Sequence, residues 1–187
     1  MIETKRLIIR QFKPEDSTDL FDYLSKPETY KFEPGEPVTI EEAQQICVER
    51  AKGKDFFAVE RKENHKMIGH LYFKQIDPTE FMTWELGYIF NPEYQRRGYG
   101  SEAAQALVEY GFKNYKIHRI MARCNPDNVA SWKLLESIGF IREGNFRKYA
   151  FFHRDEQGQP IWTDAYEYSM LREYGWDRSD RNNPRLT

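Results

Sequence analysis

The sequence has 187 residues, of which 40% are hydrophobic and 31% charged, and its formal net charge is −2. This size and composition suit one domain with a single core, and the balanced charge does not favour nucleic acid or an anionic membrane as a partner. The N-terminal residues contain no apolar signal segment and no later run reaches membrane-spanning length, so we expect a cytoplasmic protein. The two cysteines form no CxxC motif and the four histidines lie far apart, which predicts reduced thiols and no bound metal.

The N-terminal part of the chain predicts a strand, a helix and a loop. Residues 4–12 (TKRLIIRQF) read as an opening strand. Residues 13–25 follow as a helix, with Pro14 in the first turn, where proline is tolerated, and apolar side chains on one face. Residues 30–39 contain two prolines and a glycine, which predicts a loop.

A second helix and three strands come next. Thr39 and Glu42 have the spacing of a capping box, so a helix is expected to begin there. Residues 55–61 and 67–76 have the pattern of two strands joined in an antiparallel hairpin. Residues 81–90 (FMTWELGYIF) form a further predicted strand.

The hydrophobic period changes from that of a strand to that of a helix at Tyr99. Apolar residues recur at helical spacing as far as Phe112, and residues 118–124 then form a short buried strand. Strand, helix and strand in this order predict a parallel pair joined by a crossover helix. Residues 128–137 form another helix, which Gly139 ends.

The last part of the chain predicts two strands, at residues 140–154 and 163–171, followed by a polar tail at residues 177–187. No repeat and no linker divides the chain, so residues 1–176 are expected to form one domain. The predicted fold class is α/β. It has a mixed central sheet of about seven strands, with antiparallel hairpins around one parallel crossover pair, and about four helices.

The segment QRRGYG (95–100) spans the start of the helix at Tyr99. Unpaired N–H groups and the positive end of the helix dipole favour an anion there, and Gly98 lets the backbone approach it closely. Arg96 and Arg97 can add charge-assisted hydrogen bonds to phosphate oxygens. The spacing is neither that of a P-loop nor that of a dinucleotide fingerprint. From these residues alone, a phosphate site and a glycine-rich helix start with two solvated arginines are both open.

Three segments of the chain resemble the GCN5-related N-acetyltransferases (GNAT), which bind acetyl-coenzyme A (acetyl-CoA). QRRGYG resembles their [RQ]-x-x-G-x-[GA] pyrophosphate-binding loop, and the preceding ELGYIFNPEY resembles their fourth strand. Residues 118–144 are similar to a signature of the RimJ- and RimL-type branch, the ribosomal-protein alanine N-acetyltransferases. The resemblance covers residues 4–176 in order. It implies the GNAT fold, in which the parallel strand pair splays apart to hold coenzyme A.

The resemblance implies positions for the coenzyme between the strands that end near Phe90 and Cys124. Backbone groups of Ile89 and Phe90 would bond the pantetheine arm, and a backbone N–H near Ile89 would hold the oxyanion. Asn128 matches an asparagine that contacts the same arm, and it also fits the N-cap of its helix. The pyrophosphate would be held by the backbone amides of Gln95, Arg96, Arg97, Gly98, Tyr99, Gly100 and Ser101.

Acetyl transfer from a thioester to an amine needs a neutral amine, a stabilised oxyanion and a proton for the departing thiolate. Many members of the family take this proton from a tyrosine, but Leu135 occupies the corresponding position. Ser131 matches a serine that the alanine branch places near the coenzyme sulfur, and it is the predicted proton donor; an ordinary first-turn helix serine is the alternative. The glutamate that serves that branch as base aligns with Ala150, so the base must lie elsewhere.

Glu85 is the predicted general base. Strand alternation places it on the same face as Gly87, whose missing side chain leaves room for an amine or a water. A strand glutamate that faces solvent or pairs with a lysine is the alternative. His70 and His153 are secondary candidates, and both are expected to be surface residues of strands.

The resemblance implies a protein N-terminal α-amine as acceptor, with a small amine such as a polyamine, amino acid or antibiotic as the alternative. A non-catalytic CoA sensor also remains open, because the usual tyrosine is missing. Residues 146–154 interleave basic and aromatic side chains, but the overall charge argues against nucleic acid. Either a monomer or a homodimer is compatible with these patterns. The acceptor pocket is expected to include Tyr30, Phe32, Phe146, Tyr149, Phe151 and Trp162.

Overall fold

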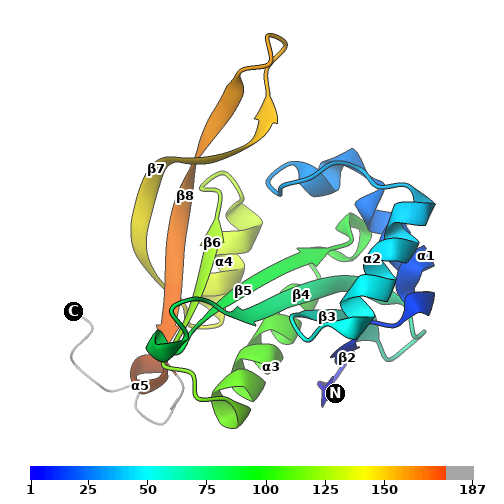
Figure 1. Cartoon of the computed structure of the whole chain (residues 1–187). Coiled ribbons are helices and arrows are strands. Elements are labelled where there is room, and N and C mark those ends of the chain that lie inside the picture. The colour runs from blue at the N-terminus through cyan, green and yellow to red at the C-terminus, as the bar shows by residue number, and fades with distance from the viewer. Residues whose placement is uncertain (176–187) are drawn as a thin grey trace.

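The computed structural model describes residues 1–175, so the predicted tail at 177–187 lies outside the described range. Eight strands form one sheet in the order β1-β2-β3-β4-β5-β6-β8-β7 (Figure 1). All neighbours are antiparallel except β5 and β6, which confirms the predicted mixed sheet with one parallel pair. The strands are β1 (Ile2–Glu3), β2 (Leu7–Gln11), β3 (Phe56–Arg61), β4 (Met67–Gln75), β5 (Thr83–Phe90), β6 (Arg119–Cys124), β7 (Ile141–Arg154) and β8 (Pro160–Leu171).

The one strand that the sequence patterns did not predict is β1, because two residues are too short to show a period. β1 pairs with β2 at the edge of the sheet. At the opposite edge β7 and β8 form a long hairpin that projects beyond the rest of the sheet (Figure 1).

Four helices of more than one turn connect the strands, in agreement with the prediction. The capping box that begins the second helix is formed: Thr39 Oγ1 accepts from the Glu42 N–H at 3.2 Å, and the Glu42 carboxylate accepts from the Thr39 N–H at 2.7 Å. Within residues 1–175, no helix is long and apolar enough to cross a bilayer. The helices are α1 (Ser17–Leu24), α2 (Ile40–Lys52), α3 (Tyr99–Asn114) and α4 (Val129–Ser137), followed by the single turn α5 (Arg172–Gly175).

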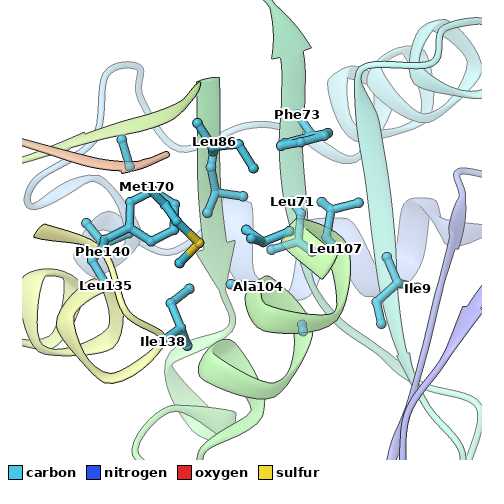
Figure 2. Packing of buried hydrophobic residues seen from close by; sticks show 14 of the residues in the cluster. Ile9, Leu71, Phe73, Leu86, Ala104, Leu107, Leu135, Ile138, Phe140 and Met170 are labelled. Atoms are coloured by element: carbon cyan, nitrogen blue, oxygen red, sulfur yellow. The ribbon is translucent and has the colours of Figure 1, made fainter. Parts of the chain in front are cut away.

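The sheet separates two apolar layers, because α3 and α4 pack on one face and α1 and α2 on the other. Figure 2 shows the first layer, where Leu107 of α3, Leu135 of α4 and Met170 of β8 converge on strand residues. The second layer includes Leu20 of α1 and Ala43 of α2. Successive side chains of β5 therefore enter different layers, and this alternation decides which of them can reach the functional site.

His70 belongs to the second layer, and the expectation that it is a surface residue is wrong. Its side chain is only 3% exposed, and its Nδ1 lies 2.7 Å from the hydroxyl of Tyr23. The rings of Phe12 and Phe56 pack beside it. Burial lowers the pKa of His70 well below its ordinary value, so the ring is neutral at neutral pH. His70 is therefore part of the core and does not reach the site described next.

Candidate active site

The two parallel strands pair along only part of their length. The paired residues run from Thr83↔Arg119 to Glu85↔Met121. Beyond this point β5 remains paired with β4 as far as Phe90, and β6 remains paired with β8 along its whole length. β5 and β6 therefore separate towards their C-terminal ends, and a gap opens in the sheet between them (Figure 1). This is the splay that the family resemblance implied.

Strand alternation decides which peptide groups of β5 face the gap. The Asn91 N–H donates to the Ile68 carbonyl at 2.9 Å, and the Thr83 carbonyl accepts from the Ile76 N–H at 3.0 Å. In an antiparallel ladder these two bonds direct every odd-numbered residue of β5 towards β4. The peptide groups of Ile89 therefore point to β4 and not into the gap, where the predicted backbone contact would need them.

Tyr88 and Phe90 are the residues whose peptide groups face the gap. Gln95 Nε2 donates to the Phe90 carbonyl at 3.0 Å, which ties the start of the QRRGYG loop to the end of β5. The N–H groups of Tyr88 and Phe90 and the carbonyl of Tyr88 remain directed into the gap, where β6 no longer pairs with them. They present the edge of a strand to which an extended ligand can add.

The QRRGYG loop lies beside this gap and has the features of an anion site. Gly98 has a left-handed backbone (φ +77°), and α3 begins at the next residue. Within residues 1–175, the N–H groups of residues 96–101 donate to no acceptor. The guanidinium groups of Arg96 and Arg97 are exposed beside them. A row of unpaired N–H groups at a helix N-terminus with two cations nearby fits a pyrophosphate.

Arg6 contacts the loop from the bend between β1 and β2, which no sequence pattern predicted. Its Nη1 donates to the Arg97 carbonyl at 3.0 Å, and its Nε donates to the Glu102 carboxylate at 2.7 Å. On the other side, α3 and α4 approach closely at Gly100, because a Cβ there would lie 2.8 Å from Leu134 Cδ1. The loop is therefore held in shape from both sides.

Asn128 and Ser131 lie at the start of α4, where Asn128 is the N-cap residue. Asn128 Oδ1 accepts from the Ser131 N–H at 3.2 Å, which confirms the N-cap role. The Asn128 Nδ2 has no partner among the described residues, so the amide can still donate to a ligand. The predicted contact between Asn128 and the pantetheine arm stays a prediction.

The Ser131 hydroxyl lies in a cluster with Tyr88 and Cys124. The Tyr88 hydroxyl is 2.9 Å from Ser131 Oγ and donates to the Ser131 carbonyl at 3.1 Å. Since a tyrosine has one hydroxyl proton, the Ser131 hydroxyl then donates to Tyr88 Oη. Burial raises the pKa of the Cys124 thiol to about 11, and the nearby Ser131 side chain acts to lower it. Cys124 is therefore a neutral thiol at the end of β6.

Leu135 and Ala150 occupy the positions of the family's usual acid and base, and Glu85 is the base that the sequence predicted. Leu135 is fully buried in the first apolar layer, and Ala150 lies half-buried on β7 opposite Thr163. Glu85 is half-buried at the last pair of the parallel ladder, beside Lys74 of the neighbouring strand. By alternation its side chain lies on the opposite face of β5 from Tyr88, so the structure does not bring Glu85 and Ser131 together.

The aromatic residues predicted for the acceptor pocket divide between the loop and the hairpin. Tyr30 is buried, and its hydroxyl donates to the Leu24 carbonyl at 2.9 Å. His153 Nε2 lies 3.0 Å from the Tyr30 carbonyl, which joins the β7–β8 hairpin to the loop before α2. Half or nearly half of the surface of Phe146, Tyr149 and Trp162 is exposed on the hairpin, and Phe32 and Phe151 are half-buried.

Two side chains of the site were missed by sequence reasoning: Tyr88 and Cys124. Alternation placed Tyr88 on the face of Leu86, but no sequence signal linked it to Ser131. Cys124 was considered only as a reduced thiol.

Comparison with known proteins agrees with this geometry. The family described as Acetyltransferase (GNAT) domain matches residues 6–141. The uncharacterized N-acetyltransferase YnaD of Bacillus subtilis (strain 168) is 40% identical over 174 residues, which cover 92% of this chain and 97% of that protein.

Two solved structures have the same arrangement of elements. An acetyltransferase (GNAT family) from Bacillus anthracis superposes with a TM-score of 0.83 and 35% identity, over 92% of this chain and 98% of that chain. A ribosomal-protein-S5-alanine acetyltransferase from Vibrio fischeri superposes with a TM-score of 0.76 and 27% identity, over 92% and 97%. These similarities extend over nearly the whole of each chain.

Proposed function

The chain belongs to the GNAT acetyltransferase family, and we propose that it transfers the acetyl group of acetyl-CoA to the N-terminal α-amine of a protein. The family uses acetyl-CoA as its acetyl donor, and the chain is accordingly an N-acetyltransferase. The observation that carries the proposal is the row of unpaired N–H groups at residues 96–101, which opens beside the gap between β5 and β6. Similarity to the alanine acetyltransferase from Vibrio fischeri supports a protein acceptor.

Four features of the chain hold the donor in this proposal. The unpaired amides of residues 96–101 form the cradle that binds the pyrophosphate, and Arg96 and Arg97 balance its charge; the Gln95 N–H, also predicted to bind it, already donates to the Pro92 carbonyl at 3.3 Å. The peptide groups of Tyr88 and Phe90 bond the pantetheine arm as an added strand. The free Nδ2 of Asn128 donates to the same arm from α4. Acetyl-CoA supplies a thioester, whose acyl carbon is open to attack by an amine.

Ser131 and Tyr88 carry the chemistry of the leaving group. The Tyr88 N–H, directed into the gap, donates to the oxyanion that develops on the thioester carbonyl. The Ser131 hydroxyl gives its proton to the departing sulfur, and Tyr88 holds that hydroxyl in place through the 2.9 Å contact. Burial raises the pKa of the Tyr88 hydroxyl, so it remains protonated and keeps its hydrogen bonds to Ser131, while a proton from solvent replaces the one that Ser131 gives to the sulfur.

Ser131→Ala is expected to lower kcat about tenfold, equivalent to ~1.4 kcal/mol, because a thiolate leaves with modest help from an acid. The dissociation constant for acetyl-CoA should change less than twofold, since the hydroxyl acts on the sulfur alone. Steady-state kinetics by thiol release and calorimetric titration measure the two quantities. Ser137→Ala, an exposed serine on the same helix, is the matched control. An unchanged kcat in Ser131→Ala removes this residue from the mechanism.

The proposed function is tested first by calorimetric titration with acetyl-CoA, with NAD and ATP as controls. Selective binding of acetyl-CoA is expected, followed by thiol release with an alanine-initiated peptide. Spermidine tests the small-amine alternative in the same assay. Failure to bind acetyl-CoA contradicts the cradle, and binding without turnover on any amine identifies a CoA sensor instead of an enzyme.

A further inference from the structure

The bend between β1 and β2 is bound to the first turn of α3 by hydrogen bonds. The Thr4 hydroxyl donates to one oxygen of the Glu102 carboxylate at 2.6 Å, and the Arg6 N–H donates to the same oxygen at 3.0 Å. The Arg6 side chain donates through Nε to the other oxygen at 2.7 Å. Its guanidinium carbon also lies 4.3 Å from the centre of the Tyr99 ring. The backbone and the side chain of Arg6 are therefore both fixed relative to α3.

The Arg6 side chain also decides the direction of one peptide group in the QRRGYG loop. Arg6 Nη1 donates to the Arg97 carbonyl at 3.0 Å. The peptide that joins Arg97 to Gly98 is trans, and in a trans peptide the carbonyl and the following N–H point in opposite directions. The bond from Arg6 therefore directs the Gly98 N–H away from the guanidinium. That N–H is one of the unpaired amides of residues 96–101.

The next peptide of the loop is fixed by the helix itself. The Glu102 N–H donates to the Gly98 carbonyl at 3.1 Å, which is the first hydrogen bond of α3. A Cβ at Gly98 would lie 3.4 Å from Arg6 Nη2, so the guanidinium packs closely against this residue. Both peptide groups of Gly98 are thus held in place before any ligand binds.

Arg6 also balances a negative charge near the unpaired amides. A carboxylate in the first turn of a helix is attracted to the same positive end as an anionic ligand, and the two repel each other. Burial acts to raise the pKa of Glu102, but hydrogen bonds with Thr4 and Arg6 outweigh it and hold that pKa below its ordinary value. Glu102 is therefore ionised at neutral pH, and its ion pair with Arg6 reduces the repulsion of an anion at the helix start.

We infer that Arg6 is a positioning residue for the acetyl donor, because it directs the Gly98 N–H towards the pyrophosphate and balances the charge of Glu102. The inference rests on the proposed function, since it takes the pyrophosphate of acetyl-CoA as the ligand of the loop. Arg6 acts through the Arg97 carbonyl and the Glu102 carboxylate, and it needs no contact of its own with the donor. Its effect should therefore depend on whether the donor contains a pyrophosphate.

The two bonds of the Arg6 side chain require a guanidinium. Its Nε and Nη1 donate at the same time to two acceptors, the Glu102 carboxylate and the Arg97 carbonyl. A lysine ammonium is a compact charge on a flexible stem, which can balance Glu102 but lacks the rigid fork that holds both acceptors. Arg6→Lys therefore separates the charge of this residue from its orienting role.

Calorimetric titration with acetyl-CoA tests the inference in Arg6→Gln, and Lys62→Gln is the matched control. Lys62 donates from Nζ to Glu3 of β1 at 2.8 Å, so the control also removes an ion pair from the N-terminal strands. The affinity for acetyl-CoA should fall about 10- to 100-fold in Arg6→Gln and stay within about twofold of the parent in Lys62→Gln. Arg6→Lys should bind at most about threefold more tightly than Arg6→Gln.

Kinetics with two donors separate an effect on the pyrophosphate from a general loss of structure. S-acetylpantetheine has the thioester and the pantetheine arm of acetyl-CoA but no pyrophosphate. With an alanine-initiated peptide as acceptor, kcat/KM for acetyl-CoA should fall about 10- to 100-fold in Arg6→Gln. For S-acetylpantetheine, kcat/KM should stay within about twofold of the parent, and so should kcat at saturating acetyl-CoA.

An affinity within threefold of the parent in Arg6→Gln overturns the inference and leaves the proposed function standing. An equal loss of kcat/KM with both donors also overturns it, because the substitution then acts on the whole fold. Full recovery of affinity in Arg6→Lys overturns the orienting role, since charge alone is then sufficient. If the parent does not bind acetyl-CoA, the proposed function and the inference are both wrong. If the parent binds acetyl-CoA but does not acetylate the peptide, only the proposed acceptor is wrong, and the calorimetric comparison still decides the role of Arg6.

Discussion

Gly98→Val is expected to weaken acetyl-CoA binding about 100- to 1,000-fold, equivalent to ~3–4 kcal/mol. Gly98 has a φ of +77°, a backbone conformation that a β-branched residue strongly disfavours. The turn must therefore rebuild, which moves the N–H groups of residues 96–101 away from the pyrophosphate. Each lost hydrogen bond to a charged group costs about 1.5–3 kcal/mol, so the loss of two accounts for the effect.

Calorimetric titration of acetyl-CoA measures this effect, and a second glycine supplies a closely matched control. Gly158, in the turn between β7 and β8, has a φ of +76°, and no atom lies within 4 Å of the position of its missing Cβ. Gly158→Val therefore introduces the same backbone strain far from the cradle, and it should leave the affinity unchanged. An equal loss in both variants attributes the effect to general destabilisation, and unchanged affinity in Gly98→Val contradicts the cradle.

Arg10→Gln is expected to reduce the free energy of unfolding by about 3–5 kcal/mol. Arg10 donates to both carboxylate oxygens of Asp16, at 2.7 and 2.9 Å, and its Nε donates to Glu60 at 2.7 Å. The side chains of Arg10, Asp16 and Glu60 are only 11%, 7% and 9% exposed. Removing the cation leaves two mostly buried carboxylates without their main partner. A loss of this size is a large part of the about 5–15 kcal/mol that stabilises a typical domain.

The same variant should have a characteristic pH dependence. Burial acts to raise the pKa of Glu60, but hydrogen bonds with His65 and Arg10 outweigh it and hold that pKa below 4.5. A depressed carboxyl pKa stabilises the fold above the unfolded-state value, and this contribution disappears as the pH falls through the folded-state value. The difference in stability between the parent and Arg10→Gln should therefore be complete at pH 7 and should shrink below pH 4.5.

Urea denaturation at pH 7 and at pH 4 measures both parts of this prediction. Lys62→Gln removes an exposed ion pair with Glu3 and should cost less than about 1 kcal/mol. A difference of less than 1 kcal/mol between the parent and Arg10→Gln at pH 7 contradicts the structural role of the triad. A difference that does not change between the two pH values contradicts the part assigned to Glu60.

In the proposed mechanism, a contact between two different elements compensates for the absence of the usual tyrosine acid. Leu135 fills the core at the position of that tyrosine, and the hydroxyl of Tyr88 reaches α4 from β5. The tyrosine therefore supports the Ser131 hydroxyl from the strand that also faces the coenzyme gap. Tyr88→Phe distinguishes this arrangement from a purely structural one, because it should lower kcat without changing the affinity for acetyl-CoA.

The sequence by itself determined the order of elements from the strand at residues 4–12 onward, the single parallel pair and the glycine turn at the start of α3. Each of these depends on local signals: the change of period at Tyr99, the capping box at Thr39, and Gly98 at the helix start. Such signals involve residues only a few positions apart, and their geometry follows from backbone sterics and side-chain periodicity. The N-cap at Asn128 was also predictable, because the residue that it caps lies three positions away.

Which groups lie together in the site could be seen only in the tertiary structure. The peptide groups of Ile89 are directed to β4 because the pairing of β4 with β5 sets the alternation, and no pattern within one strand contains that register. The Tyr88–Ser131 contact joins residues 43 positions apart. Contacts between distant segments are set by how the elements pack and where the strands separate, which local sequence signals do not encode.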